Sequence, residues 1–298
     1  MRDLKTLRLV CLAAVGFLAA CSPAGLLNAS IATRDLTIVK DVAYAPGPRH
    51  GLDIYRPASQ QQHLPLIVFI YGGNWRTGDK DMYPFVAATL ARRGAVVMVP
   101  NYRLFPEVAF PAFVQDNAAA VAWARDHAAA YGADPGPLFV MGHSAGAYNA
   151  VMLGLDPQWL AEVGMKPAEL AGVIGLAGPY DFLPVTDPDV IPVFAPVQDG
   201  PLSQPITFAD GHNPPMFLAA GSADTTVNPR NTEALASKIA RLGGPVQSTV
   251  YPGVGHIGII IAFAPLFSGK APVANDVWAF VQAHLASAPA LDAAVSLR

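Results

Sequence analysis

The chain has 298 residues, of which 52% are hydrophobic and 14% are charged, and its formal net charge is −3. This length and composition fit a globular domain that is large enough to bury a core of its own. Lysine and arginine form no run or patch along the sequence, which argues against nucleic acid as a partner.

The first twenty residues have the pattern of an export signal rather than of a folded element. Arg2, Lys5 and Arg8 precede an apolar run from Leu9 to Ala20, and Cys21 follows directly. This run is short for a bilayer span but has the length of a signal-peptide core. Small residues directly before a cysteine resemble the bacterial lipoprotein signal, which implies cleavage before Cys21, diacylglycerol on its sulfur and acylation of the new N-terminus.

The lipoprotein interpretation predicts an exported protein that is anchored to a bacterial membrane through Cys21. Ser22 favours the periplasmic side of the outer membrane over the inner membrane. The alternative is an ordinary secretory signal in which the cysteine occurs by chance. The only other cysteine, Cys11, lies inside the signal, so the exported chain would have no cysteine nucleophile, no disulfide and no thiolate metal site. Its formal net charge would be −5, because the signal contains three basic residues and one acidic residue.

After the signal, residues 21–37 are predicted to form a tether and residues 38–290 a single folded domain. The pattern at 38–44 and 52–55 predicts a hairpin or two short strands. Apolar runs predict further strands at 66–71, 96–99, 138–141, 173–176, 216–219 and 246–251. Helical patterns fill the gaps at 79–93, 111–131, 145–155, 229–242 and 273–285. This alternation predicts the α/β class, with a mostly parallel central sheet flanked by helices.

The strand at 138–141 runs directly into Gly142-His143-Ser144-Ala145-Gly146, and an alanine-rich helix follows. The pattern G-x-S-x-G is typical of a sharp strand-to-helix turn that exposes a strained serine. Gly142 and Gly146 provide the space that such a turn needs. Ser144 is therefore the candidate nucleophile. The alternative is a glycine-rich turn in which the serine is incidental.

A serine nucleophile requires a histidine base, which in turn requires an orienting carboxylate. His256 is the only histidine that follows a predicted strand, while His143 within the turn is expected to point away from the Ser144 oxygen. Asp224 follows the strand at 216–219 and is the preferred carboxylate. Asp181, which follows an earlier strand, is the competing candidate. Asp116 falls inside a helix and is interpreted as structural.

The oxygen that becomes negative during acyl transfer needs hydrogen-bond donors that are already in place. One candidate donor is the N–H of Ala145, the residue after the nucleophile. The others belong to the loop after the strand at 66–71, where Gly73 and Asn74 are preferred and Gly72 is a further option. The alternative is a plain strand-to-helix turn, which a Gly-Gly-Asn sequence would also suit.

These segments together resemble a known family. The stretch Tyr71–Lys80 (YGGNWRTGDK) is similar to the H-G-G-x-W…G-x-K motif of hormone-sensitive-lipase-like and feruloyl-esterase-like (BD-FAE) carboxylesterases, and 100–116 is similar to their Y-R-L-x-P-E…F-P…D segment. The serine turn, residues 178–182, Asp224 and His256 occur in the family order. The resemblance covers about residues 40–287 and implies an α/β-hydrolase fold that uses no metal and no organic cofactor.

One position departs from the family motif, because Tyr71 stands where the family has histidine. We expect activity to survive this change. The resemblance implies a carboxylic-ester hydrolase that acts through an acyl-enzyme on Ser144. The sequence has no long apolar insertion that would indicate a lipase lid, which favours short acyl chains over triglyceride. Trp75, Tyr180 and Phe182 are candidate substrate contacts, with further aromatic or apolar candidates at Phe105, Phe194 and Ile257.

Two other functions remain open from the sequence. The same machinery cleaves amides, so an arylformamidase-like or peptidase-like amide hydrolase is the first alternative. The second is a catalytically silent lipoprotein that uses the hydrolase fold for binding. Tyr71 is the only feature of the sequence that supports this silent alternative.

Overall fold

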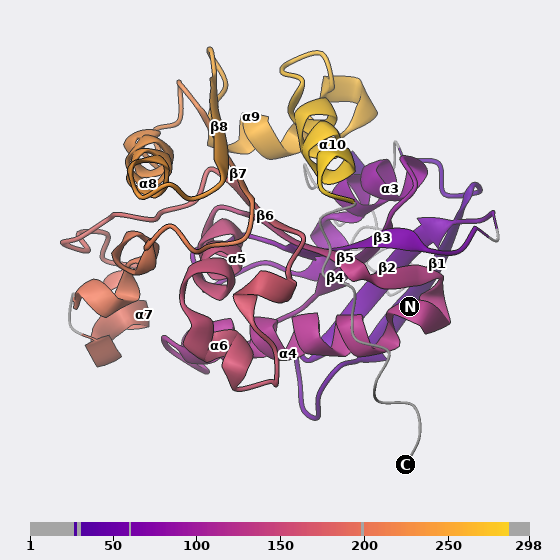
Figure 1. Ribbon diagram of the computed structural model, residues 1–298, viewed down its shortest axis with the longest axis horizontal. Helices are drawn as coiled ribbons and strands as arrows, with labels where there is room; N and C mark the ends of the chain where they lie inside the picture. Colours follow the sequence, from indigo (N-terminus) through magenta and orange to yellow (C-terminus); the bar gives the residue numbers. More distant parts are fainter. Residues whose placement is uncertain (1–26, 29–30, 60, 198–199, 286–298) are drawn as a thin grey trace, which may run out of the picture.

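The computed structural model describes residues 27–28, 31–59, 61–197 and 200–285, so the predicted signal and Cys21 lie outside the described residues. A central sheet of eight strands has the order β1-β2-β4-β3-β5-β6-β7-β8 (Figure 1). The strands are β1 (Leu36–Ala43), β2 (Gly51–Pro57), β3 (Leu64–Ile70), β4 (Val96–Pro100), β5 (Ala133–His143), β6 (Gly172–Leu176), β7 (Met216–Gly221) and β8 (Val246–Tyr251).

The sheet has an antiparallel edge and a parallel remainder. β2 pairs antiparallel with both β1 and β4, whereas every neighbouring pair from β4 through β3 to β8 is parallel. Strands β3, β4, β6 and β7 are buried along their whole length, as continuous apolar strands covered on both faces must be. The structure thus confirms the predicted α/β class and the α/β-hydrolase fold.

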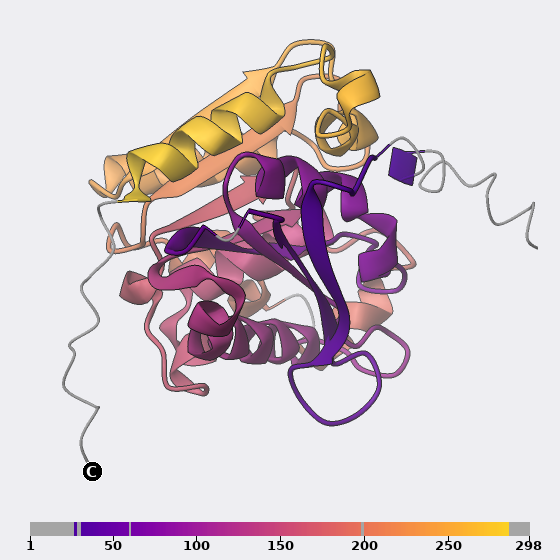
Figure 2. The same ribbon diagram turned by 90° about the vertical axis from the view of Figure 1, so that its right-hand side faces the viewer.

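Helices cover both faces of the sheet. Helices α3 and α10 lie together on one face, and α4, α5 and α6 pack together on the other (Figures 1 and 2). Helix α8 packs against the β7–β8 end of the sheet. The bounds are α3 (Pro84–Arg92), α4 (Ala112–His127), α5 (Ala145–Leu155), α6 (Pro157–Ala161), α7 (Ile191–Phe194), α8 (Arg230–Arg241), α9 (His256–Ile261) and α10 (Val273–Ala283).

Several predicted boundaries differ from the structure by a few residues, and two of these differences have a clear cause. The helix predicted over 79–93 is divided into a short 3₁₀ turn, η1 (Lys80–Met82), and α3, because Tyr83 leaves the helical conformation and Pro84 begins a new helix. The predicted tether is shorter than 21–37, since β1 already begins at Leu36 and the side chains of Ile31 and Leu36 are buried in the core. Over the described ranges, no helix is long and apolar enough to cross a bilayer.

The parallel strands determine where the candidate site forms. Ser144 follows β5, Asp224 lies just after β7, and His256 follows β8 by a short loop. The loop with Gly73 and Asn74 follows β3. All four segments leave the sheet at the carboxyl ends of parallel strands, and these ends meet along one edge of an open α/β sheet.

Candidate active site

Ser144 occupies the tight turn between β5 and α5. Its backbone has φ 56° and ψ −124°, a conformation that costs about 1–3 kcal/mol for a residue with a side chain. A Cβ atom at Gly142 would lie 2.1 Å from the carbonyl oxygen of Gly146, and one at Gly146 would lie 2.1 Å from that of Ile70. Only glycine fits at these two positions, as the motif predicts.

The turn is held against the neighbouring strand. The N–H of Ser144 donates to the carbonyl of Leu176 at the end of β6, at 2.9 Å. This bond fixes the strained residue to the rigid sheet, so the serine hydroxyl is positioned by the fold and not by a mobile loop.

His256 contacts both partners that the sequence analysis selected. Its Nε2 lies 2.9 Å from Ser144 Oγ, and its Nδ1 lies 2.8 Å from Asp224 Oδ2. An ionised carboxylate can only accept, so Nδ1 has the proton and Nε2 is left to accept from the serine hydroxyl. The carboxyl group of Asp224 is fully buried, and its other oxygen accepts the N–H groups of Thr226 and Val227, each at 2.9 Å.

The competing carboxylates lie elsewhere. The Asp181 side chain is partly exposed, and its nearest ionic partner is Arg230 at 4.0 Å, while its own N–H donates to the side chain of Asn231. Asp116 is buried and accepts three hydrogen bonds from the Arg103 guanidinium, the shortest at 2.6 Å. Asp116 therefore has the structural environment expected for it, and Asp224 is the carboxylate in contact with His256.

His143 lines the cavity with Ser144 and contacts the backbone of His256, a role that the sequence did not predict. Its Nε2 lies 3.1 Å from the backbone carbonyl of His256, and the two rings are 4.9 Å apart. A carbonyl can only accept, so Nε2 has the proton. Burial lowers the pKa of His143 to about 3, and the nearby His256 adds to the effect. The ring is therefore a neutral donor that holds the loop of the candidate base.

The candidate oxyanion donors lie around the same space. A cavity of about 390 Å³ is lined by Ser144 and His256 together with Gly72, Gly73 and Asn74. Among the described residues, the N–H groups of Gly73, Asn74 and Ala145 have no hydrogen-bond acceptor. Gly73, with φ 132°, again has no space for a Cβ, because the carbonyl oxygen of Thr77 would lie 2.2 Å away. Donors that are left unpaired at a helix N-terminus and a glycine turn suit an anionic oxygen.

A second cavity of about 250 Å³ adjoins the first and shares Asn74 and Thr226 with it. Trp75 and Phe182 line this smaller cavity, as predicted for substrate contacts, and Ile257 lines the larger one. The indole N–H of Trp75 donates to Asn149 at 3.0 Å, a partner that the sequence did not reveal. This bond fixes the orientation of the indole.

The prediction for Tyr180 needs correction, since its side chain is completely buried and lines neither cavity. Its ring lies over the backbone of Gly175 and Gly178. Phe194 is likewise a core residue, packed against Trp75 at 4.9 Å between ring centroids. The guanidinium carbon of Arg76 lies over the ring of Phe105, 4.9 Å from the centre of that ring. Whether an aromatic residue near a motif lines the cavity or packs in the hydrophobic core thus depends on tertiary packing, which the sequence pattern does not specify.

The fold and the Ser144 turn define a protein of the α/β-hydrolase class. The sequence model of the family BD-FAE matches residues 52–239, more than half of the chain, and the chain belongs to this family.

Named relatives are similar over much of the chain. A probable isoprenylcysteine alpha-carbonyl methylesterase of rice is 26% identical over 86% of this chain and 66% of its own length. Esterase LipC of Mycobacterium tuberculosis is 28% identical over 72% of this chain and 58% of its own. Kynurenine formamidase of zebrafish is 31% identical over 49% of this chain and 47% of its own. The chain spans about half to two thirds of the length of the plant relatives that it matches.

Solved structures with the same fold include esterase B of Lactobacillus rhamnosis, with a TM-score of 0.76 and 17% identity over 93% of this chain and 96% of that one. A truncated carbohydrate esterase from gut microbiota has a TM-score of 0.70 and 23% identity over 84% of this chain and 96% of that one. Identities at this level support the fold and leave the substrate open.

Proposed function

We propose that this chain is a carboxylic-ester hydrolase that acts through an acyl-enzyme on Ser144. The observation that carries the proposal is the continuous set of contacts from Asp224 through His256 to Ser144, at 2.8 and 2.9 Å. Membership of a family whose named relatives include several esterases supports it.

The geometry suggests a role for each group. His256 Nε2 takes the proton of Ser144 as Oγ attacks the ester carbonyl, and the N–H groups of Gly73, Asn74 and Ala145 stabilise the negative oxygen. His256 then gives the proton to the departing alcohol, and water hydrolyses the acyl-Ser144 by the same steps. Asp224 keeps the imidazole in the productive tautomer and stabilises its charged form.

The two cavities support a small ester as the substrate. The cavity that contains Ser144 and its neighbour measure about 390 and 250 Å³, and Trp75 and Phe182 are among the residues that line the smaller one. Pockets for drug-sized ligands occupy about 300–1,000 Å³. We therefore favour short or compact acyl groups over long chains.

The alternatives from the sequence now have different support. The 31% identity to a kynurenine formamidase over half of the chain keeps amide hydrolysis as the second candidate. The silent-lipoprotein reading depended on Tyr71, but this side chain is buried and does not line the cavity with Ser144. Tyr71 therefore gives no direct obstacle to the chemistry.

The proposal is tested with the full chain and its Ser144→Ala variant. We expect hydrolysis of p-nitrophenyl acetate and butyrate to fall by at least about 10³-fold in the variant, because the nucleophile is lost. Rates on palmitate esters and on formyl and acetyl anilides, measured in parallel, distinguish short-chain esterase from lipase and amidase. Equal rates for wild type and variant on every substrate would contradict the proposal.

We also propose that the chain is exported and anchored to a bacterial membrane by lipid on Cys21. The basic, apolar and cysteine pattern of residues 2–21 supports this location. Two or three acyl chains hold a protein firmly on a bilayer, whereas one does so weakly. Cells grown with labelled palmitate should transfer label to the wild-type protein. Label that persists in Cys21→Ala would show that the anchor is not at this cysteine.

A further inference from the structure

Tyr71, the residue that departs from the family motif, has a buried side chain with two strong partners. Its hydroxyl donates to Asn101 Oδ1 at 2.8 Å and accepts from Arg49 Nη2 at 2.7 Å. Its ring stacks on the rings of Tyr83 and Tyr102, with centroids 5.7 and 4.8 Å away. Burial raises the pKa of the hydroxyl, so it stays protonated and can fill both roles at once.

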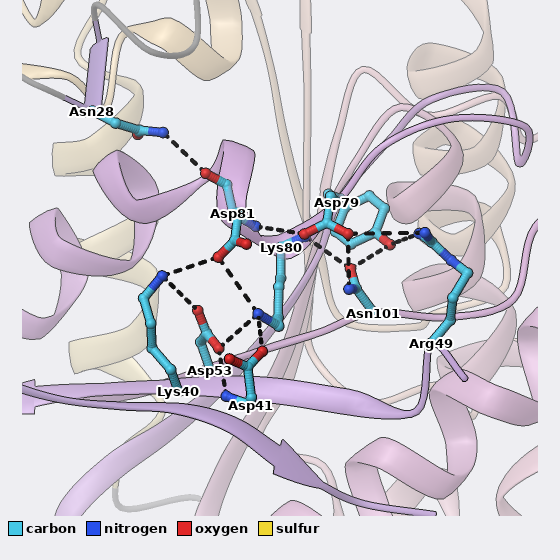
Figure 3. A network of polar contacts seen from close by, with 10 residues as sticks. Asn28, Lys40, Asp41, Arg49, Asp53, Asp79, Lys80, Asp81 and Asn101 are labelled. Atoms are coloured by element: carbon cyan, nitrogen blue, oxygen red, sulfur yellow. Dashed lines mark hydrogen bonds and ion pairs between the residues drawn. The ribbon is translucent and has the colours of Figure 1, made fainter. Parts of the chain in front are cut away.

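The two partners of Tyr71 also bind the far end of the loop that begins with it. Arg49 donates through the same guanidinium to the carbonyl of Gly78 at 2.8 Å. Asn101 Oδ1 accepts the N–H of Lys80 at 2.8 Å, and its amide donates to Asp79 at 2.9 Å (Figure 3). The start and the end of the segment 71–80 are therefore joined through two side chains from other parts of the chain. Arg49 comes from the loop between β1 and β2, and Asn101 directly follows β4.

The loop needs this support because its interior is strained. Gly73, Asn74 and Trp75 have φ values of 132°, 52° and 55° in succession. Such conformations persist in residues with side chains only where the surrounding structure holds them. Inside the loop, the carbonyl of Gly73 accepts the N–H groups of Arg76 and Thr77, at 2.9 and 3.0 Å. These bonds shape the turn but do not attach it to the sheet.

The unpaired N–H groups of Gly73 and Asn74 lie between the two attached ends. We propose that Tyr71, Arg49 and Asn101 form a clamp that positions this loop, so that the N–H groups of Gly73 and Asn74 meet the developing oxyanion. The clamp acts through the loop backbone, because none of its three members lines the cavity with Ser144. The inference rests on the proposed ester hydrolysis and names residues that set its rate.

The clamp makes a specific kinetic prediction. Oxyanion donors act on the transition state at separations of about 2.7–3.1 Å, so a small displacement lowers kcat more than it changes KM. Tyr71→Phe keeps the stacked ring and removes only the hydroxyl. We expect its kcat on p-nitrophenyl butyrate to fall about 10- to 100-fold, with KM within about twofold of wild type. Affinity for a trifluoromethyl ketone, which forms an oxyanion on Ser144, should fall by a similar factor.

Three further variants separate positioning from loss of stability. Tyr251→Phe is the matched control, since it removes another buried tyrosine hydroxyl, one that donates to Asp276 at 2.7 Å and contacts no member of the clamp. It should keep kcat within about twofold. Arg49→Met should lower kcat like Tyr71→Phe, and the double variant should lose much less than the product of the two losses, because both act through one clamp.

Amide hydrogen exchange tests the clamp independently of catalysis. Peptides that cover 72–79 should exchange faster in Tyr71→Phe than in wild type, while peptides from β7 should not change. Unchanged exchange in 72–79, or a kcat within twofold of wild type in an active enzyme, would overturn the clamp. If instead the wild type is no more active than Ser144→Ala, the proposed function fails, and faster exchange would still support the clamp as a structural device.

Discussion

The loop after β3 separates two polar regions that use hydrogen bonds in opposite ways. On the cavity side, the N–H groups of Gly73 and Asn74 have no acceptor among the described residues. On the other side, Arg49, Asn101 and Lys80 have nearly all their polar atoms paired with the loop and the antiparallel edge of the sheet. A site that must bind a ligand keeps hydrogen-bond donors unpaired, whereas the residues that support the site have their own donors and acceptors paired within the protein.

The support includes a cluster of charged side chains in which Lys80 and Asp53 are buried and Asp41 is exposed (Figure 3). Lys80 Nζ lies 2.7 Å from Asp41 and 2.9 Å from Asp53, whose carboxylate is fully buried in β2. Burial alone would lower the pKa of Lys80, but hydrogen bonds to Asp41 and Asp53 outweigh it and raise that pKa. This cluster ties the end of the loop to the antiparallel edge, so we expect changes here to affect stability first and turnover second.

The largest effect on turnover is expected on the cavity side. Asp224→Asn should lower kcat on p-nitrophenyl butyrate by about 10³- to 10⁴-fold, because the amide no longer holds the productive tautomer of His256. The melting temperature should change little, since Asn can still accept the N–H groups of Thr226 and Val227. Asp181→Asn is the control and should stay within about twofold of wild type. Equal losses of kcat in the two variants would contradict the assignment of Asp224 as the carboxylate that orients His256.

On the support side, Lys80→Met should lower the free energy of unfolding by about 3–5 kcal/mol, because it leaves Asp53 buried without its main partner. Lys40→Met removes an exposed lysine that lies 3.7 Å from the same carboxylate and should cost about 1 kcal/mol or less. Urea unfolding measures both. Below the unfolding temperature, Lys80→Met should retain far more activity than Asp224→Asn. Similar stabilities for the two lysine variants would show that the cluster is not a specific support.

The smallest effect is a dependence of stability on pH. The pKa of His143 in the folded chain is about 3, below that of a free histidine, so the unfolded chain binds the extra proton as pH falls below about 6.5. Folded stability therefore falls on acidification by up to about 1.4 kcal/mol per pH unit from this residue.

His143→Gln should remove this contribution, so urea unfolding at pH 7 and pH 5 should give a shallower loss than in wild type. His63→Gln changes an exposed histidine and should leave the wild-type slope unaltered. The same slope in all three proteins would mean that His143 does not remain neutral in the folded chain.

Local patterns were sufficient for much of this molecule. The apolar runs located β3, β4, β6 and β7 to within about two residues, since a strand that is buried on both faces must be apolar throughout. The turn at Ser144 was recognisable because its close approaches admit only glycine at positions 142 and 146. The chain order of Ser144, Asp224 and His256 followed from the expectation that each residue comes after a parallel strand.

What the tertiary structure decided is which side chains meet. Asp224 and Asp181 both follow strands, and only packing directs Asp224 to His256 and leaves Asp181 partly exposed. In the sequence, Tyr71 is only a residue that departs from the family motif. The structure shows that its hydroxyl forms hydrogen bonds with Arg49 and Asn101, which are 22 and 30 residues away in the sequence. Periodicity reports the face on which a residue lies, but contacts between distant segments depend on register, strand order and side-chain direction, which no local pattern contains.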